Sequence, residues 1–308
     1  MSSRNWKEYN NQLVRRGEAL LDFDFLKGWG VELEKMNENK WSRPYEYPES
    51  FAKFLAFLYV AFNLPYRQLE GFIKALMRLN PDLKKPDHAT IHRRVMKLNL
   101  NLDDSLKKSK EPITIAVDAS GIKVTNRGEW IRKKWKKEKK GFVKIHFAVD
   151  TKKRQIVAME VTDEKTGDIK KFESLVEKSS KKQKVKKVLA DSAYDSRKNY
   201  SYLKEKGIEP GIKPRKVLTT PKGWKDLKGR RINAKARGNM TRKKEVMEYT
   251  IDPDKWKQKK GYGERWNVEI LFSAFKRIYG EYARAKDFKN MIREMELKVF
   301  TYNFLLNC

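Results

Sequence analysis

The stretch ITIAVDASGIKV, residues 113–124, alternates Ile113, Ile115 and Val117 with smaller or polar side chains before it reaches Asp118. A period of two is typical of a β-strand whose two faces differ. The same alternation recurs in two further segments, FVKIHFAVD (142–150) and RQIVAMEVTD (154–163). The sequence therefore predicts three consecutive strands.

A different order of elements follows these strands. The segment IKKFESLVEKSS (169–180) predicts a helix, with Asp168 as its expected N-cap. The run VKKVLAD (185–191) predicts a short buried strand, and a further helix starts near Asp195, which we assign mainly to capping. Two long helices follow from residue 261. Strands first and alternating elements later predict an α/β domain with a mixed sheet and helices packed against it.

Residues 1–105 carry helical patterns instead. An apolar run, FAKFLAFLYVAF (51–62), is followed by LPYRQLEGFIKALMRLN (64–80) and by a helix for which Asp87 is a plausible N-cap. A helix, a turn and a short helix bearing Arg93 and Arg94 suit a helix-turn-helix whose last helix enters the major groove of DNA. A plain helical bundle with a surface arginine pair is the alternative. We therefore expect a helical region, 1–105, before the α/β domain, 106–308.

The charge balance points to a polyanionic partner. The chain has 71 Lys and Arg against 40 Asp and Glu, a net charge of +31. Residues 1–105 hold 17 basic and 14 acidic side chains, which leaves 54 − 26 = +28 for the rest. Such a field favours nucleic acid. Thermophile-type surface charging is the alternative, but it raises Glu together with Lys.

Composition also bounds the compartment. The single cysteine, Cys308, allows no internal disulfide and no cysteine metal cage. The longest apolar run contains Lys53 and is too short to span a bilayer, and the first residues lack the apolar segment of a secretory signal. We expect a soluble, cytoplasmic protein without a membrane partner.

Two basic segments interrupt the α/β pattern. Residues 212–244 carry thirteen Lys and Arg and one Asp, within a basic insertion at about 212–258. The run WIRKKWKKEKK (130–140) interleaves Trp130 and Trp135 with cations. Both segments could follow phosphates and offer stacking surfaces for bases. The alternative is a pair of solvated loops with tryptophans that simply pack.

The segment YGERWNVEILFSAFKR (262–277) predicts a helix with two stripes. At about 100° per residue, an apolar stripe spans roughly 160° to 280° and includes Ile278 at its edge. A polar stripe of about 60° borders it and holds Tyr262, Arg265, Glu269 and Lys276. Ordinary charge pairs on a solvated face are one explanation. The presence of the Glu269 carboxylate among so many cations calls for a second explanation.

Three acids could converge at one edge of the sheet. Asp118 and Asp191 end two predicted strands, and Glu269 lies on the border of the later helix. Converging carboxylates bind Mg²⁺ or Mn²⁺, and two such ions can assist an in-line phosphoryl transfer. Each strand acid has a structural alternative, a turn for Asp118 and a helix cap for Asp191. Asp150 and Asp163 could be mistaken for either acid.

These segments together resemble a known family. Tyr262, Arg265, Glu269 and Lys276 match Y-x2-R-x3-E-x6-K, which resembles the signature of DDE transposases of prokaryotic insertion sequences, in the insertion sequence four/five-like group. The blocks VDASGIKV, KIHFAVD and LADSAYD resemble the family's other acidic blocks, in the right order. LPYRQLEGF and HATIHRR are similar to the helical N-terminal region of the insertion sequence five group.

The resemblance implies a ribonuclease H-like catalytic domain with Asp118, Asp191 and Glu269 as catalytic acids and metal ligands for two Mg²⁺ ions, which Mn²⁺ can replace. It further implies cutting of transposon terminal inverted repeats, joining to target DNA, and a homodimer that pairs two ends beside the nucleoid of a prokaryotic cell. Tyr262, Arg265 and Lys276 would grip the DNA backbone, and His146 would pack beside the site. A ribonuclease H-like nuclease and a non-catalytic DNA-binding protein remain alternatives.

Overall fold

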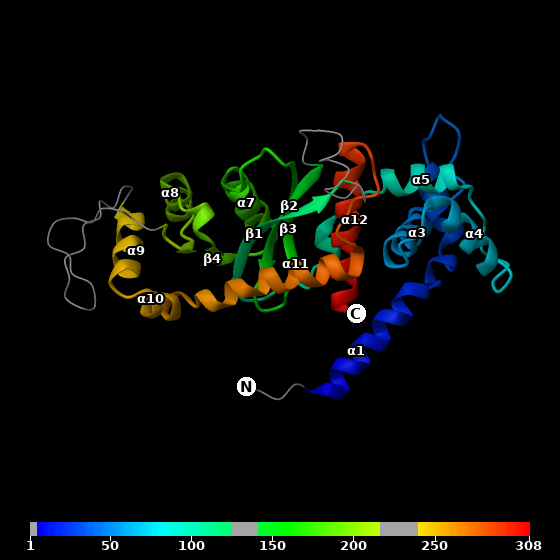
Figure 1. Ribbon diagram of the computed structural model, residues 1–308. Coiled ribbons are helices and arrows are strands. Elements are labelled where there is room, and N and C mark those ends of the chain that lie inside the picture. Colours follow the sequence, from blue (N-terminus) through cyan, green and yellow to red (C-terminus); the bar gives the residue numbers. More distant parts are fainter. Residues whose placement is uncertain (1–4, 125–140, 216–239) are drawn as a thin grey trace, which may run out of the picture. The chain divides into compact units, whose positions relative to one another are not determined.

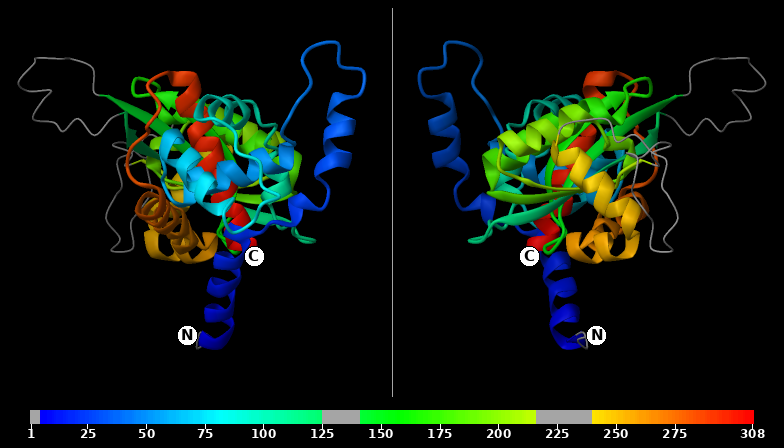
Figure 2. Two further views of the ribbon diagram at one scale, coloured as in Figure 1. Left: turned by 90° about the vertical axis from the view of Figure 1, so that its right-hand side faces the viewer. Right: turned by 90° about the vertical axis from the view of Figure 1, so that its left-hand side faces the viewer.

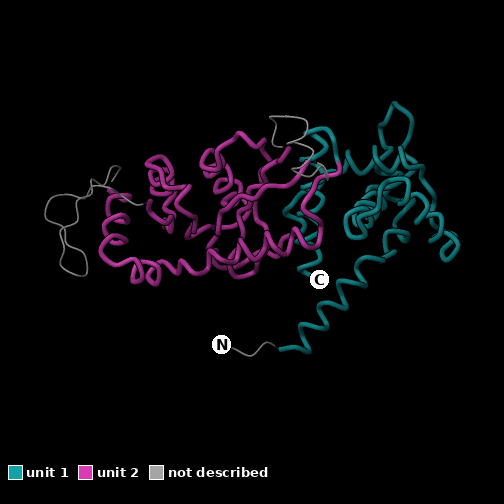
Figure 3. The backbone as a smooth tube through the Cα atoms, in the orientation of Figure 1, with its two compact units in different colours: residues 1–105, 285–308 teal, residues 106–284 magenta. Residues whose placement is uncertain are grey.

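A computed structural model describes residues 5–124, 141–215 and 240–308 (Figure 1). The chain divides into two compact units, residues 1–105 with 285–308 (unit 1) and residues 106–284 (unit 2) (Figure 3). No helix in these ranges has both the length and the apolar character needed to cross a membrane.

Unit 2 is built on a five-stranded mixed sheet with the order β3-β2-β1-β4-β5. The strands are β1 (Ile113–Lys123), β2 (Phe142–Asp150), β3 (Ile156–Asp163), β4 (Val185–Ala190) and β5 (Glu209–Ile212). β1, β2 and β3 pair antiparallel, whereas β4 runs parallel to β1 and β5 parallel to β4. β1, β2 and β3 confirm the alternation read from the sequence, β4 confirms the short buried strand, and the mixed sheet confirms the expected α/β class.

β5 was not expected, because its sequence EPGI contains a proline and a glycine, which strands disfavour. Gly211 has a specific reason to be there. A Cβ at this position would lie 2.4 Å from the Leu189 side chain and 3.1 Å from the Val188 carbonyl oxygen on β4. The close approach of β5 to β4 therefore depends on a residue without a side chain.

Helices cover the two faces of the sheet. The core cluster holds Val117 and Ala148 of the sheet and Phe172, Leu175 and Val176 of α7 (Phe172–Lys182). Phe147, the neighbour of Ala148, must point to the opposite face. Its ring stacks on Phe272 of α11 (Trp266–Tyr279), with centroids 4.8 Å apart. α7 and α11 therefore pack on opposite faces (Figure 1).

Further helices of unit 2 lie in its described residues. They are α8 (Arg197–Glu205), α9 (Met240–Ile251) and α10 (Pro253–Lys260). Asp168 does not cap the helix that follows it, because a 3₁₀ turn (Asp168–Lys171) precedes α7 and the Asp168 carboxylate instead pairs with Lys144 at 3.1 Å. Ser196, rather than Asp195, caps α8 through the N–H of Asn199.

Unit 1 is helical, as expected for residues 1–105. Its helices are α1 (Trp6–Glu18), α2 (Trp29–Asn37), α3 (Glu49–Ala61), α4 (Tyr66–Leu76), α5 (His88–Lys97) and α12 (Phe288–Asn307). Asp87 caps α5 by accepting from the N–H groups of Ala89 and Thr90, as predicted. α1 extends away from the other helices of its unit and buries no residue (Figure 2).

The division differs from the sequence-based one at the C-terminus. Residues 285–308 lie in unit 1 and not in the α/β unit. Phe57 of α3 packs against Phe304 of α12, with ring centroids 4.7 Å apart, and the Arg293 side chain donates to the Leu98 carbonyl. The first pair is 304 − 57 = 247 positions apart in the chain and the second 195, so no local pattern predicts these contacts.

Candidate active site

Asp118 and Asp191 meet because β1 and β4 are parallel neighbours. Val117 of β1 pairs with Ala190 of β4. Asp118 is the next residue along β1, and Asp191 is the first residue after β4. The two acids therefore lie side by side. The sequence predicted that Asp118 ends its strand, but β1 continues beyond it to Lys123, where it still pairs with β2, so only Asp191 follows the end of its strand.

The third acid reaches the same place through α11. Phe272 and Phe275 fix this helix on Phe147, and Phe147 pairs with Asp118 in the β1–β2 register. Arg265 then bridges two of the acids. Its Nη1 lies 3.4 Å from Asp118 Oδ2, and its Nη2 donates to the Glu269 carboxylate one helical turn away. Asp118, Asp191 and Glu269 therefore converge.

The other two acids also affect the ionisation of Asp118. Its pKa is raised from 3.8 to about 6. Burial of the carboxyl group is the largest cause, and the negative charges of Asp191 and Glu269 add to it. Hydrogen bonding from the Ala119 N–H, at 2.8 Å, and the charge of Arg265 act in the opposite direction. The site holds more negative charge than one guanidinium neutralises.

Asp191 is held in a fixed orientation. Its Oδ1 accepts from the N–H of Ala193 at 2.9 Å, which caps the 3₁₀ turn Ser192–Tyr194. The structure thus gives Asp191 the capping contact that the sequence left as an alternative, and the same residue also lies in the acid cluster. One carboxylate can serve both purposes, because it has two oxygens.

Tyr262 and Arg265 precede α11 in a 3₁₀ turn (Tyr262–Arg265). Gly261 begins this turn with φ 61°, a left-handed conformation that glycine adopts without steric cost. The Tyr262 hydroxyl lies 3.4 Å from the Ala190 carbonyl oxygen, and burial raises the pKa of Tyr262 to about 12. In this structure, Tyr262 and Arg265 thus bind protein groups next to the acids.

Other residues of α11 differ in how far they are exposed. Lys276 lies about two turns beyond Glu269 on α11 and is half-buried. Ile278, placed in the apolar stripe by the sequence, is exposed, whereas the rest of that stripe is buried. Trp266 is 61% exposed beside Arg265 and was not selected from the sequence. Its position near 40° on the same helical wheel lies outside the apolar stripe and would have predicted that the ring is exposed.

The other candidate acids have structural roles. Asp150 accepts from the N–H groups of Lys152 and Lys153, and Asp163 accepts from Thr166, so both stabilise turns. His146 is buried, and its Nε2 lies 2.8 Å from the Thr162 hydroxyl. Burial lowers the pKa of His146, as expected for a packed, neutral imidazole.

The acid cluster has the donor chemistry of a divalent cation site. Within the described ranges, no three His, Cys, Asp or Glu side chains are arranged so that they could hold a metal ion. At the acid cluster, Arg265 instead supplies positive charge to two of the three carboxylates. Hard oxygen donors and unneutralised negative charge fit Mg²⁺ or Mn²⁺, provided that the guanidinium yields its place.

In unit 1, the two arginines chosen as DNA contacts behave differently. Arg93 is exposed on α5, and its Nη2 donates to the Thr90 hydroxyl at 3.2 Å. Arg94 turns inward: its Nη2 donates to the Tyr47 carbonyl at 2.8 Å, and its guanidinium lies 4.6 Å from the centroid of the Tyr45 ring. Only Arg93 is presented to solvent for a phosphate.

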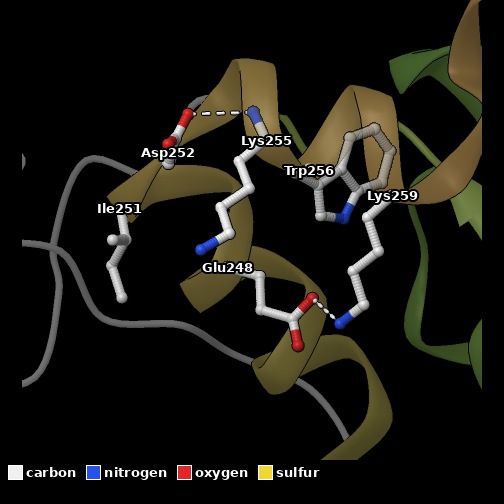
Figure 4. A pocket seen from close by; sticks show the side chains of 6 residues that line it. All are labelled: Glu248, Ile251, Asp252, Lys255, Trp256 and Lys259. Atoms are coloured by element: carbon white, nitrogen blue, oxygen red, sulfur yellow. Dashed lines mark hydrogen bonds and ion pairs between the residues drawn. The ribbon is translucent and has the colours of Figure 1, made fainter.

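The two basic segments are described only in part. The run 130–140, with Trp130 and Trp135, lies outside the described residues, as does the middle of the basic insertion 212–258. The later part of the insertion forms α9 and most of α10, with a cavity of about 280 Å³ between these helices (Figure 4). The cavity is lined by Glu248, Ile251, Asp252, Lys255, Trp256 and Lys259. None of the three converging acids lines it, so it belongs to the helical pair.

The chain has matches among known protein families and among solved structures. Two family models, both described as a transposase DDE domain, match residues 109–304 and residues 14–127. The first match alone spans well over half of the chain. The protein therefore belongs to the family of DDE transposases. Among solved structures, it is similar to a piggyBac transposase in a synaptic complex with hairpin DNA. The identity is 11% and the TM-score 0.44, over 96% of this chain and 74% of that chain.

Proposed function

We propose that the protein is a transposase that cuts the ends of its element and joins them to target DNA, with Asp118, Asp191 and Glu269 as its catalytic acids. The observation that carries the proposal is the convergence of these acids from β1, from the turn after β4 and from α11. Membership in the DDE transposase family supports it.

The proposal includes a ribonuclease H-like fold for unit 2. The expected arrangement has one acid on the first strand, one after the fourth strand and one on a late helix, and the observed elements have this order. We further propose that the protein belongs to the insertion sequence four/five-like group, because of the spacing from Tyr262 to Lys276.

The three carboxylates would hold one or two Mg²⁺ ions, with Mn²⁺ as a substitute. Bound there, divalent ions would activate the attacking oxygen and neutralise charge on the leaving oxygen of the phosphodiester. The protein's own part is to bind and orient. Asp191 is fixed by the Ala193 N–H, and α11 is fixed by its phenylalanines, so the acids do not have to be ordered when DNA arrives.

Arg265 would change partners during this process. Once metal neutralises the carboxylates, its guanidinium is available for a DNA phosphate, as is Lys276 of the same unit. In unit 1, the exposed Arg93 would bind a phosphate of its own. Phosphate contacts of this kind position the duplex without reading its sequence. The exposed ring of Trp266 could stack on an unpaired base at the cut end. We propose that residues 1–105 recognise the terminal inverted repeats, that the active form is a homodimer that pairs two ends, and that it acts on DNA in the prokaryotic cytoplasm.

The test uses labelled DNA that carries the flanks of the gene, incubated with Mg²⁺ or Mn²⁺ and either the wild type or Glu269→Gln. Metal-dependent cuts at the flank ends, joined products and their loss in the variant are expected. Scattered cuts without joining would instead identify a nuclease. Binding without any cut would contradict the catalytic role and leave a DNA-binding protein.

A further inference from the structure

Asp195 is a buried acid that the catalytic proposal does not use. Its side chain is fully buried and forms a bidentate pair with Arg242 of α9, with Nε–Oδ1 at 2.6 Å and Nη2–Oδ2 at 2.7 Å. Oδ2 also accepts from the backbone N–H of Arg215 at 2.9 Å. Three hydrogen bonds from two separate parts of the chain therefore end on one carboxylate.

The turn between Asp191 and Asp195 is held from a second direction. The Arg215 side chain donates from Nε to the Ser192 carbonyl at 2.7 Å and from Nη2 to the Ala193 carbonyl at 3.0 Å. The N–H of the same Ala193 donates to Asp191. Arg215 thus hydrogen-bonds to the turn whose Ala193 N–H orients the Asp191 carboxylate.

These contacts form one continuous network. It runs from Arg242 to Asp195, from Asp195 to Arg215, and from Arg215 through the turn Ser192–Tyr194 to Asp191. Charge-assisted bidentate pairs are strong and directional, and a buried pair keeps this strength because water does not screen it. A displacement at Asp195 is therefore transmitted over a single turn to Asp191.

We propose that Asp195 is a positioning residue for the catalytic site. Paired with Arg242 and Arg215, it fixes the turn that carries Asp191, and it makes the placement of this acid depend on α9, the helix that follows the basic insertion. The inference rests on the proposed function, since it assigns Asp195 a role in shaping the metal-binding carboxylates. Because the Asp195 carboxylate is taken up by Arg242 and by the Arg215 N–H, we do not assign it as a metal ligand.

The competing explanation is that Asp195 only anchors α9. Glu245 provides a matched control, because it is a second buried carboxylate that anchors α9, this time from the helix itself, bonded to Trp256 at 2.7 Å and to Lys260 at 2.8 Å. Its contacts do not reach the Asp191 turn. Loosening α9 through Glu245→Gln should therefore lower stability without disturbing Asp191.

The experiment measures Mn²⁺ binding to the full chain by electron paramagnetic resonance, together with the thermal unfolding temperature of each variant. Asp195→Asn replaces an acceptor with an amide that faces the donors of Arg242. We expect this variant to bind Mn²⁺ at least fivefold more weakly than the wild type, and Glu245→Gln to stay within twofold. Asp191→Asn is the reference for direct loss of a ligand.

Arg242→Lys is a second variant, in case Asp195→Asn does not fold. It keeps the charge but loses the planar fork, and we expect it also to weaken Mn²⁺ binding. Unchanged Mn²⁺ affinity in both variants, with a wild type that binds Mn²⁺, would overturn the positioning role and leave the proposed function standing. If Glu245→Gln weakened Mn²⁺ binding by the same factor, the positioning role would also be overturned, in favour of the explanation that Asp195 only anchors α9. A wild type that binds no Mn²⁺ would instead contradict the metal site on which both proposals depend.

Discussion

Arg265 and Asp118 lie 3.4 Å apart, Nη1 to Oδ2, although 147 positions separate them in the chain. The same guanidinium also binds Glu269. A side chain of this unit thus provides positive charge at the place where we propose that metal binds. The contact links β1 to the start of α11, and it sets up a competition between an internal cation and an external one.

Replacement of Arg265 should expose this competition. In EDTA, Arg265→Gln is expected to lower the free energy of unfolding by about 1–3 kcal/mol, because two partly buried carboxylates lose a charged donor. Adding Mn²⁺ should then raise the unfolding temperature of the variant more than that of the wild type. Arg265→Lys, which keeps the charge, serves as control. An equal Mn²⁺ effect on all three proteins would show that Arg265 does not occupy the cation site.

The raised pKa of Asp118 predicts a dependence of stability on pH. Because the folded pKa is about 6 and the ordinary value is 3.8, the folded state binds more protons than the unfolded state between pH 4 and pH 6. Stability should therefore fall as pH rises through this window. Without metal at pH 7, Asp118→Asn should be more stable than the wild type by up to about 3 kcal/mol. Below pH 4 the two should be equal. Thermal unfolding in EDTA across pH 3.5 to 7.5 measures this, and a difference that does not vary with pH would refute it.

Arg93 and Arg94 should respond differently to truncation. Arg93→Ala is expected to weaken DNA binding and to lower the slope of log K against log salt by about one, as for a lost phosphate contact. Arg94→Ala should mainly reduce stability, because the bond to the Tyr47 carbonyl and the contact with the Tyr45 ring disappear. Filter binding at several salt concentrations, with unfolding curves for both variants, separates the two effects. A salt slope that changes only in Arg94→Ala would reverse the assignment.

The buried lysine of α10 offers a test of how the insertion is anchored. Lys260 is 5% exposed and pairs with Glu245 at 2.8 Å and Glu209 at 3.2 Å. Lys260→Met should cost about 3–5 kcal/mol, because it leaves Glu245 buried without its cation. Its neighbour Lys259 forms an exposed pair with Glu248, so Lys259→Met should cost under about 1 kcal/mol. Chemical denaturation of both variants is the measurement, and similar losses would mean that the Lys260 pair is not effectively buried.

The sequence predicted what local patterns encode. A period of two placed β1, β2 and β3, and a short buried run placed β4. Asp118 and Asp191 were chosen from these strands, although Asp118 lies within β1 and not at its end. The helical spacing from Tyr262 to Lys276 placed Glu269. These signals are local because a strand or helix repeats its burial pattern over a few residues.

The sequence did not predict what distant contacts decide. Asp195 read as a cap because an acid before a helix commonly is one, yet Arg242, 47 positions later, takes its carboxylate. Arg94 was predicted to contact DNA from its neighbours alone, and its hydrogen bond to the Tyr47 carbonyl, again 47 positions away, was not expected. α12 joined unit 1 through Phe57 for the same reason. The residues next to a side chain in the sequence therefore do not predict which distant residue it contacts in the fold.

The parallel register of β1 and β4 also constrains how the gene can change. Val117 faces Ala190, and the acids follow each of them by one residue. Successive residues of a strand point to opposite faces, so one residue inserted into or deleted from β4 would turn Asp191 away from Asp118. Loops between the strands can lengthen at small cost. Variation in length among descendants of this gene should therefore collect in loops and leave the six residues of β4 unchanged in number.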